Sequence, residues 1–368
     1  MTDTNTSFNP TWVSPPGDTI AELLEEKGWS QQELAQRLGY TPKHLSQLVN
    51  GKVPLSEDAA MRLERVLGST ARFWLSREAL YRERLARLGE HQKLSGWVDW
   101  LEDLPLKDLM QMGEISAARL EKKNYPSLVD AMLQFFGVAS PDEWKARYVG
   151  MQLCFRRTRE DQSHIGAISS WLRLGERRAE KLDGPKYDQA KFEEALPEIR
   201  KLTKVADGSF KSQLLELCRN SGVTLVIVPS IRGAHVSGVA RWLSPQRPLI
   251  QLSMYGKSND KFWFTFFHEA AHLLLHGNEK KAVFLDDGSV EGESSRQEKE
   301  ANKWAADFLI PVERQDVLPY LKTKAEVKRF AGEIGVHTGI VVGRLQHSRT
   351  ISQKWMNDLK VSFEAKES

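Results

Sequence analysis

Apolar residues recur every three or four positions over the first 70 residues, in short runs separated by turn-forming residues. This spacing is typical of amphipathic helices that share one small core. Ser30 with Glu33 three residues later predicts a capping box, and Gly39 and Thr41 mark the end of one helix and the start of the next. The pattern therefore predicts four helices, over residues 18–26, 30–38, 41–50 and 56–67.

A different pattern occupies the last third of the chain. Segment 261–276 is apolar on nearly every side, as a buried helix would be, and a second amphipathic helix is expected over 298–310, stopped by Pro311. Before them, three short apolar runs bounded by Gly, Pro and Ser predict strands at 223–228, 238–242 and 248–252. We expect a small antiparallel sheet beside the buried helix, with an edge on which an extended peptide could lie.

The region between these two patterns, residues 76–205, is mostly helical in character and begins with an Arg-rich helix over 76–88. A chain of 368 residues exceeds what one core usually organises, so several domains are expected. The fold class is therefore α+β, in four parts. These are an all-α N-terminal domain (1–90), a helical middle region (91–205), a C-terminal domain with the small sheet (206–320) and a helical C-terminal extension (321–368).

Charge and cysteine content narrow the function classes. The net charge is only +3, and residues 1–90 hold eleven Lys and Arg against twelve Asp and Glu, so a strong non-specific nucleic-acid binder is not indicated. The basic stretch 145–204 could bind nucleic acid, although a solvated charged face is the better interpretation.

Cys154 and Cys218 lie outside any C-x-x-C pattern and are expected as buried thiols. The first residues are polar and no apolar run reaches membrane-span length, so a cytoplasmic protein without a membrane partner is expected.

The clearest chemical signal lies inside the predicted buried helix, in the sequence His268-Glu269-Ala270-Ala271-His272. One helical turn separates the two histidines, so both can reach one zinc ion from the same face. Glu269 would then act as general base toward the metal-bound water. A carboxylate buried between two imidazoles without a counter-charge is unfavourable, which favours the metal site over a structural polar cluster.

Zinc needs a third protein ligand if its fourth position is left to water. His276 lies about 12 Å along the helix axis from His268, too far to share one ion, and is expected at the helix end. Glu298 on the next helix projects toward a neighbour, with Asn302 as a hydrogen-bond partner for a ligand histidine. Glu300 lies on a different side, so Glu298 is the favoured ligand and Glu300 the alternative; in a protein without metal, either would be a solvated acidic residue in a first helical turn.

Three ordered runs, at 247–253, 262–277 and 298–311, together resemble the ImmA/IrrE metallo-endopeptidases, and the likeness covers about residues 210–315. In that family the glutamate of the E-x-x-A-N element is the third zinc ligand, and this position falls on Glu298. The chain departs from the usual family pattern at Ala271 and Trp304, where Gly and Phe are common, but neither departure removes a ligand. The resemblance implies a zincin-like domain that acts on gene regulation, often by cleaving a repressor.

The N-terminal sequence 30–51 resembles helix-turn-helix domains of the Cro/CI/XRE type, and 67–75 is similar to the HigA-like antitoxin branch. The apolar positions expected to pack its two central helices are Leu34, Ala35, Leu38, Leu45 and Leu48. Residues expected to contact double-stranded DNA are Gln31, at a phosphate, and Thr41, Lys43, His44 and Gln47, in the major groove. The alternative is a helical packing module that binds no nucleic acid.

The leading hypothesis is a DNA-binding transcriptional regulator with a zinc-dependent endopeptidase domain that cleaves a regulatory protein such as a repressor. A homodimer is expected only from the two-fold operators that such modules use. The competing hypothesis is a non-proteolytic, antitoxin-like autorepressor whose zinc domain is a sensor or binds a partner protein. Metal-dependent DNA processing is disfavoured, because nuclease sites usually combine several carboxylates with Mg²⁺.

Overall fold

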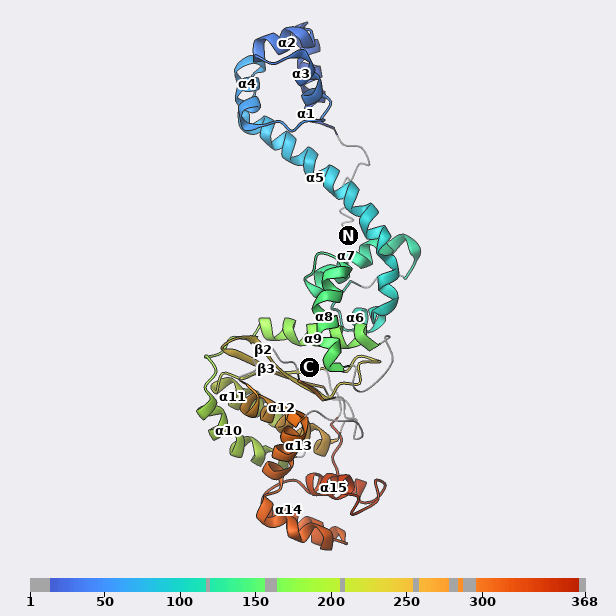
Figure 1. Cartoon of the computed structure of the whole chain (residues 1–368), viewed down its shortest axis with the longest axis vertical. Coiled ribbons are helices and arrows are strands. Elements are labelled where there is room, and N and C mark those ends of the chain that lie inside the picture. The colour runs from blue at the N-terminus through green and yellow to red at the C-terminus, as the bar shows by residue number, and fades with distance from the viewer. Residues whose placement is uncertain are drawn as a thin grey trace, which may run out of the picture. The chain divides into compact units, whose positions relative to one another are not determined.

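The computed structural model describes residues 14–116, 120–155, 164–205, 209–253, 258–277, 284–286 and 296–363, with backbone alone for 149–155, 164 and 284–286. The chain divides into two compact units, Met1–Val98 and Asp99–Ser368 (Figure 1). The finer boundaries expected at 90, 205 and 320 stay predictions.

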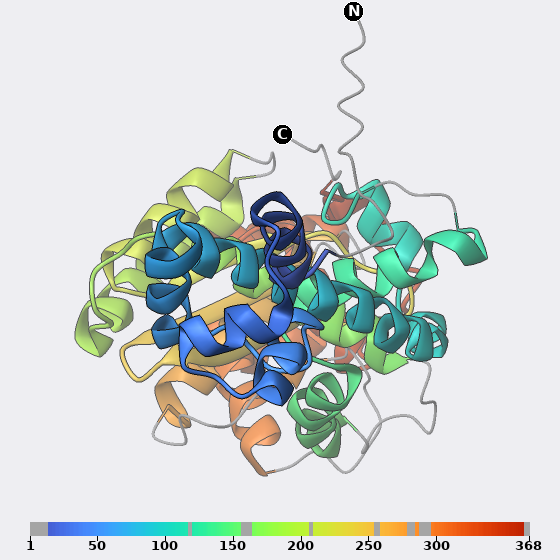
Figure 2. The same ribbon diagram turned by 90° about the horizontal axis from the view of Figure 1, so that it is seen from above.

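The N-terminal unit consists of helices alone among its described residues. Its elements are α1 (Pro16–Lys27), α2 (Gln31–Leu38), α3 (Pro42–Val49), α4 (Glu57–Leu67) and α5 (Ala71–Gly96). Figures 1 and 2 show the four short helices folded about one another, with α5 leaving them as a long single helix. The four predicted helices are confirmed, and so is their core: Leu34, Ala35, Leu38, Leu45 and Leu48 are all buried in one cluster, which Trp74 of α5 completes.

Local hydrogen bonds fix the helix ends in this unit. The side chains of Ser30 and Thr41 each accept a hydrogen bond from the backbone N–H three residues later, at 3.1 and 3.2 Å. Gly39 ends α2 with a φ of 71°, a left-handed conformation that costs glycine little. The predicted capping box is wrong in one respect, because the Glu33 carboxylate pairs with Arg37 at 2.7 Å along the helix.

The second unit is organised around a four-stranded sheet in the order β1-β3-β2-β4. The strands are β1 (Thr224–Val228), β2 (Gly238–Ser244), β3 (Arg247–Ser253) and β4 (Phe284–Asp286). Strands β2 and β3 form an antiparallel hairpin and β4 pairs antiparallel with β2, but β1 runs parallel to β3. The three predicted strands are confirmed, whereas the prediction of a wholly antiparallel sheet is wrong. Residues 229–237 connect β1 to β2, and β3 lies between these two strands in the sheet. One strand position is about 5 Å wide, so the connection is long enough to cross it.

Helices cover both faces of this sheet. The helices of the second unit are α6 (Leu106–Gln111), α7 (Tyr125–Phe136), α8 (Pro141–Phe155), α9 (His164–Glu180), α10 (Gln189–Lys201), α11 (Phe210–Asn220), α12 (Asn259–Leu275), α13 (Arg296–Leu309), α14 (Lys324–Ile334) and α15 (Thr338–His347). Short 3₁₀ turns lie at Val98–Asp103, Lys122–Asn124, Leu202–Lys204, Val312–Tyr320 and Asn357–Leu359. Helix α9 contacts one face of the sheet, and α11 and α12 lie against the other (Figure 1). The expected helices at 261–276 and 298–310 correspond to α12 and α13.

The main core of this unit includes the last helices of the chain. Trp263 and Phe266 of α12 are buried together with Phe330 of α14 and Leu345 of α15. Beyond α15, the backbone N–H of Asn259 donates to the carbonyl of Val361 at 2.8 Å, so the chain end closes the start of α12. The C-terminal segment therefore helps to hold the helix that carries both candidate histidine ligands.

A buried charge cluster joins α9 to the sheet. The Glu176 carboxylate accepts hydrogen bonds from Arg241 of β2 at 2.7 Å, Arg173 at 2.9 Å and Arg147 at 3.3 Å. Arg241 is 4% exposed and Glu176 is 6% exposed. Burial raises the pKa of Glu176, but attraction to Arg241 and the hydrogen bond from Arg173 outweigh it, so the net pKa is lowered. Part of the basic stretch 145–204 therefore serves internal ion pairs.

Two smaller expectations concern cysteines and membranes. Cys218 is buried, as expected, and burial raises the pKa of its thiol. The side chain of Cys154 lies outside the described residues. Within the described part of the chain, none of the helices combines the length and apolar character needed to cross a membrane.

Candidate functional sites

The residues expected to contact DNA lie around the start of α2 and along α3. Lys43, His44 and Gln31 are exposed, and Gln47 is half-buried. Thr41 is exposed too, but its hydroxyl already caps α3. The His44 ring packs edge-on against Tyr40, with ring centroids 4.7 Å apart. Of the five residues, Lys43, His44 and Gln47 lie on α3, and Lys43 and Gln47 have the longest side chains among them. Their contact with DNA stays a prediction.

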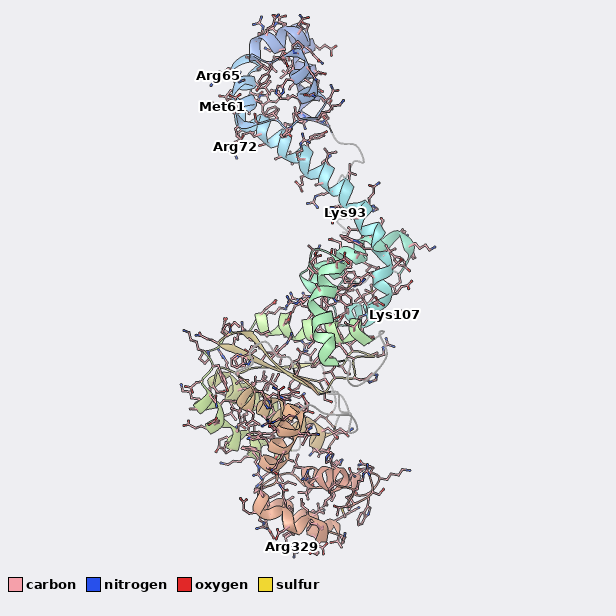
Figure 3. All side chains as sticks on the ribbon, in the orientation of Figure 1. Met61, Arg65, Arg72, Lys93, Lys107 and Arg329 are labelled. Carbon is pink, nitrogen blue, oxygen red and sulfur yellow. The ribbon has the colours of Figure 1, made fainter. Side chains whose placement is uncertain are left out.

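Exposed cations also lie on a side of the N-terminal unit away from α3 (Figure 3). Figure 3 shows Arg65 of α4 and Arg72 at the start of α5 pointing to solvent on the side of the N-terminal unit away from α3. In the second unit, Lys107 of α6 and Arg329 of α14 lie at opposite ends (Figure 3). These cations do not single out α3, so the prediction of a DNA contact depends on the geometry of α2 and α3.

Three side chains from two helices meet in the second unit. His268 and His272 point from one face of α12, with their Nε2 atoms 3.0 Å apart. Glu298, in the first turn of α13, places its Oε2 3.2 Å from His268 Nε2 and its Oε1 3.3 Å from His272 Nε2. Both helices carry fully buried alanines, Ala270 and Ala271 on α12 and Ala301 and Ala305 on α13, and such short side chains allow close packing of helices.

The spacing of these atoms fits a zinc ion. Zinc bonds of about 2.0–2.1 Å at tetrahedral angles separate neighbouring ligand atoms by about 3.3 Å. The three measured separations, 3.0, 3.2 and 3.3 Å, lie close to that value. All of the facing atoms are nitrogen or oxygen atoms with lone pairs, and the two histidines are almost completely buried. A divalent cation is the partner that such a converging set of acceptors suits best.

The protonation states also suit a metal. Burial lowers the pKa of His272 to about 4, assisted by the neighbouring His268 and opposed by Glu298. Burial raises the pKa of Glu298, but hydrogen bonds to His268 and His272 outweigh it and bring that pKa to about 2. At neutral pH His272 is therefore an uncharged imidazole and Glu298 an ionised carboxylate, which are the forms that bind zinc.

Glu269 is fully buried, and its carboxylate lies against the first residue of β2. A Cβ atom added to Gly238 would come within 2.7 Å of Glu269 Oε1 and 2.5 Å of Thr265 Cγ2. No real side chain fits at that distance, so glycine leaves the room that the carboxylate occupies. The sequence predicts Gly238 at a strand start, and its contact with Glu269 was not predicted, although glycine inside a strand does signal a close approach.

His276 and Glu300, considered and set aside as ligands, lie beside the site. His276 is the C-cap residue of α12, as expected from its place at the helix end. Its Nδ1 lies 3.2 Å from His272 Nδ1, and its Nε2 lies 3.1 Å from Glu300 Oε2. Glu300 therefore faces His276, while Glu298 faces the two Nε2 atoms. Asn302, which was suggested as the supporting partner, is exposed.

Comparisons with known proteins find a family match in each of the two regions. Residues 20–74 match the family described as helix-turn-helix, and residues 224–366 match the M78 peptidase family, described as the IrrE N-terminal-like domain. The chain is also 38% identical over 61 residues to an uncharacterized HTH-type transcriptional regulator, YddM, of Escherichia coli (strain K12). That alignment covers 17% of this chain and 65% of the relative.

Proposed function

We propose that this protein is a DNA-binding transcriptional regulator with a zinc-dependent endopeptidase site. Its sequence matches an XRE-type helix-turn-helix domain and an IrrE-like, metallopeptidase-like domain. The substrate class is a regulatory protein such as a repressor. The protein would share a compartment with the operator DNA that its N-terminal unit binds.

One observation carries the proposal. The Nε2 atoms of His268 and His272 and the carboxylate of Glu298 form a triangle of ligand atoms beside the buried carboxylate of Glu269. His268, Glu269 and His272 are almost completely buried and Glu298 is 24% exposed, and a converging set of two imidazoles and a carboxylate suits a divalent cation.

In the proposed mechanism His268, His272 and Glu298 hold the metal. A zinc ion bound there would lower the pKa of a water molecule to about 7 and polarise a peptide carbonyl. Glu269 accepts the proton of the attacking water and passes it to the nitrogen of the departing amine, so that the carboxylate ends the cycle ionised. Gly238 keeps that carboxylate beside β2 because its position has no side chain to displace it.

For DNA recognition we propose that α3 enters the major groove. Lys43 and Gln47 would contact base edges, guanine and adenine respectively, while His44 and Thr41 approach the groove and Gln31 meets a phosphate. The N-terminal unit would thus bring the peptidase site to the operator, where the regulatory protein acts.

Replacing Glu269 by Gln tests the enzymatic part of this proposal. Purified Glu269→Gln protein should keep its zinc content and its DNA binding, because no ligand changes, but lose cleavage of the protein products of neighbouring genes. Glu216→Gln, at an exposed glutamate on α11 of the same unit, is the matched control and should behave as the native protein.

The competing function, a non-proteolytic autorepressor with a zinc-bound sensor, makes the opposite prediction. Under it, Glu269→Gln would leave regulation of the target promoter unchanged, as measured with a reporter gene in cells. Native protein without cleavage of any candidate substrate, together with an unaffected reporter, would overturn the peptidase proposal and favour the sensor.

A further inference from the structure

A line of polar groups runs away from the proposed metal centre, on the far side of His272. The Nδ1 atom of His272 lies 3.2 Å from Nδ1 of His276, which is 8% exposed at the end of α12. Nε2 of His276 lies 3.1 Å from Oε2 of Glu300, and Oε1 of Glu300 accepts a hydrogen bond from Arg296 Nε at 2.7 Å. The four groups therefore form one continuous chain from the protein surface to a candidate ligand.

The charge at the outer end decides where the protons lie along this chain. A glutamate carboxylate at neutral pH only accepts hydrogen bonds, so His276 must present its proton on Nε2 toward Glu300. The Nδ1 atom of His276 is then an acceptor. When a metal ion is bound, His272 must in turn carry its own proton on Nδ1, and the lone pair of its Nε2 replaces the hydrogen bond that Glu298 accepts from His272 without the metal.

The opposite arrangement of protons is unfavourable at the Glu300 end of the chain, and at the other end it conflicts with a bound metal ion. With the proton of His272 on Nε2, its Nδ1 would need a proton from Nδ1 of His276. Nε2 of His276 would then direct a lone pair at the Glu300 carboxylate from 3.1 Å. A proton on Nε2 of His272 can form a hydrogen bond to Nε2 of His268, 3.0 Å away, but it occupies the lone pair that a metal ion needs.

We propose that His276 and Glu300 are positioning residues for the metal centre, acting through His272. They hold His272 as the Nδ1-protonated tautomer and fix the direction of its Nε2 lone pair toward a zinc ion. The inference rests on the metal site of the proposed function, but it does not depend on peptide hydrolysis. Hydrogen bonding to the outer nitrogen of a ligand histidine raises its basicity and restrains its ring, and losing it typically weakens metal binding about 10- to 100-fold.

Zinc affinity of the full-length protein, measured by competition with a chromophoric chelator, tests this inference. His276→Leu removes the acceptor for His272 Nδ1 and should weaken zinc binding about 10- to 100-fold. His276→Asn keeps an amide oxygen close to the Nδ1 position and should restore most of the affinity. His347→Leu, at an exposed histidine of the same unit, is the control and should bind zinc as the native protein does.

Glu300→Gln provides a second test at a partly exposed site, where folding should be undisturbed. The neutral amide no longer selects the tautomer, so zinc affinity should fall, by less than in His276→Leu. The visible absorption of the cobalt-substituted protein should shift in both variants, because the geometry at His272 changes, and a folding defect alone would not produce that shift.

The outcomes separate this inference from the metal site and from peptidase activity. Native-like zinc affinity in folded His276→Leu, or in Glu300→Gln with an unchanged cobalt spectrum, would overturn the positioning role. If instead His272→Ala bound zinc as tightly as the native protein, the metal site itself would be wrong. Absence of proteolysis with the expected affinity losses would remove only the enzymatic function.

Discussion

The two units of this protein place their candidate functional groups in opposite environments. In the N-terminal unit, Lys43 lies in solvent and Gln47 is half-buried, on a helix whose start is fixed by a cap from Thr41. In the second unit, His268, Glu269 and His272 are almost fully buried. The first arrangement suits contact with a large charged partner, since the exposed side chains remain hydrated and accessible until the partner binds. The second suits chemistry, since fixed groups away from water interact strongly.

The same contrast holds for the ion pairs that stabilise each unit. In the N-terminal unit, Arg87 pairs with Glu83 on the surface of α5, with side chains 77% and 54% exposed. In the second unit, Arg241 and Glu176 are side chains only 5% and 8% exposed. Exposed pairs contribute little, whereas breaking a buried pair leaves a charge without its partner. Stability in the second unit should therefore depend far more on single charged residues.

Among the changes that test this comparison, Glu176→Gln should have the largest effect on the free energy of unfolding. It leaves the buried Arg241 without a counter-charge, and the second unit should lose about 3–5 kcal/mol of unfolding free energy. Glu83→Gln, the same chemical change on α5, should cost less than about 1 kcal/mol. Urea unfolding followed by circular dichroism measures both. Equal losses in the two variants would show that the contrast between the units is wrong.

The stability of the second unit should also fall at acid pH, because Glu176 loses its charge there. The net pKa of Glu176 lies below its ordinary value of 4.5, since Arg241 and Arg173 outweigh the effect of burial. Its contribution to stability is therefore complete above pH 4.5 and is lost as the pH falls toward the lowered pKa of the folded state. Thermal unfolding from pH 7 to pH 3 should show a steeper decline in native protein than in Glu176→Gln. Parallel curves for the two proteins would contradict this assignment.

Gly238→Ala should have the next largest effect, and it probes how closely the buried site is packed. The new methyl group would displace Glu269, and a shift of about 1 Å in a catalytic group can cost about 100-fold in rate. Peptide cleavage should fall by about that factor, while the zinc content stays native. Gly332→Ala, in α14 with no atom near its added Cβ, is the control and should keep full activity. Full activity in Gly238→Ala would mean that Glu269 is not confined as described.

Gln47→Ala should have the smallest effect, since a half-buried side chain at the protein surface can be lost with little disturbance of its surroundings. Loss of a bidentate contact to adenine costs about 1–3 kcal/mol, or about 5- to 150-fold in operator affinity. Fluorescence anisotropy with operator and unrelated DNA would show whether the loss is specific to the operator. Gln92→Ala, at an exposed position on α5, should leave both affinities unchanged. An unchanged operator affinity in Gln47→Ala would exclude its proposed contact with DNA.

The N-terminal unit could be predicted closely because its determinants are local. Ser30, Gly39 and Thr41 each act on residues within one helical turn, so their spacing in the sequence was sufficient. The family match over 20–74 confirms the helix-turn-helix resemblance. The incorrect prediction of a capping box at Glu33 has the same local origin, because the carboxylate can bond either to the start of its own helix or to Arg37.

The second unit was predictable only in part, because its site depends on contacts between distant segments. The spacing of His268 and His272 follows from one helical turn, and the match over 224–366 confirms the ImmA/IrrE resemblance that indicated Glu298. The parallel pairing of β1 and the contact between Gly238 and Glu269 depend on how the chain crosses the sheet. The interaction of His276 with Glu300 depends on the packing of α12 against α13.

The space left by Gly238 has a consequence for how this gene could change over time. Every missense change at one nucleotide of a glycine codon introduces a side chain, and any side chain at this position would collide with Glu269. Such an allele would encode a chain whose proposed zinc ligands and proposed DNA-contacting helix are intact but whose proposed base is displaced. If the proposed function holds, a regulator without peptidase activity could therefore arise in one step and persist in a population, with the same metal content as its parent.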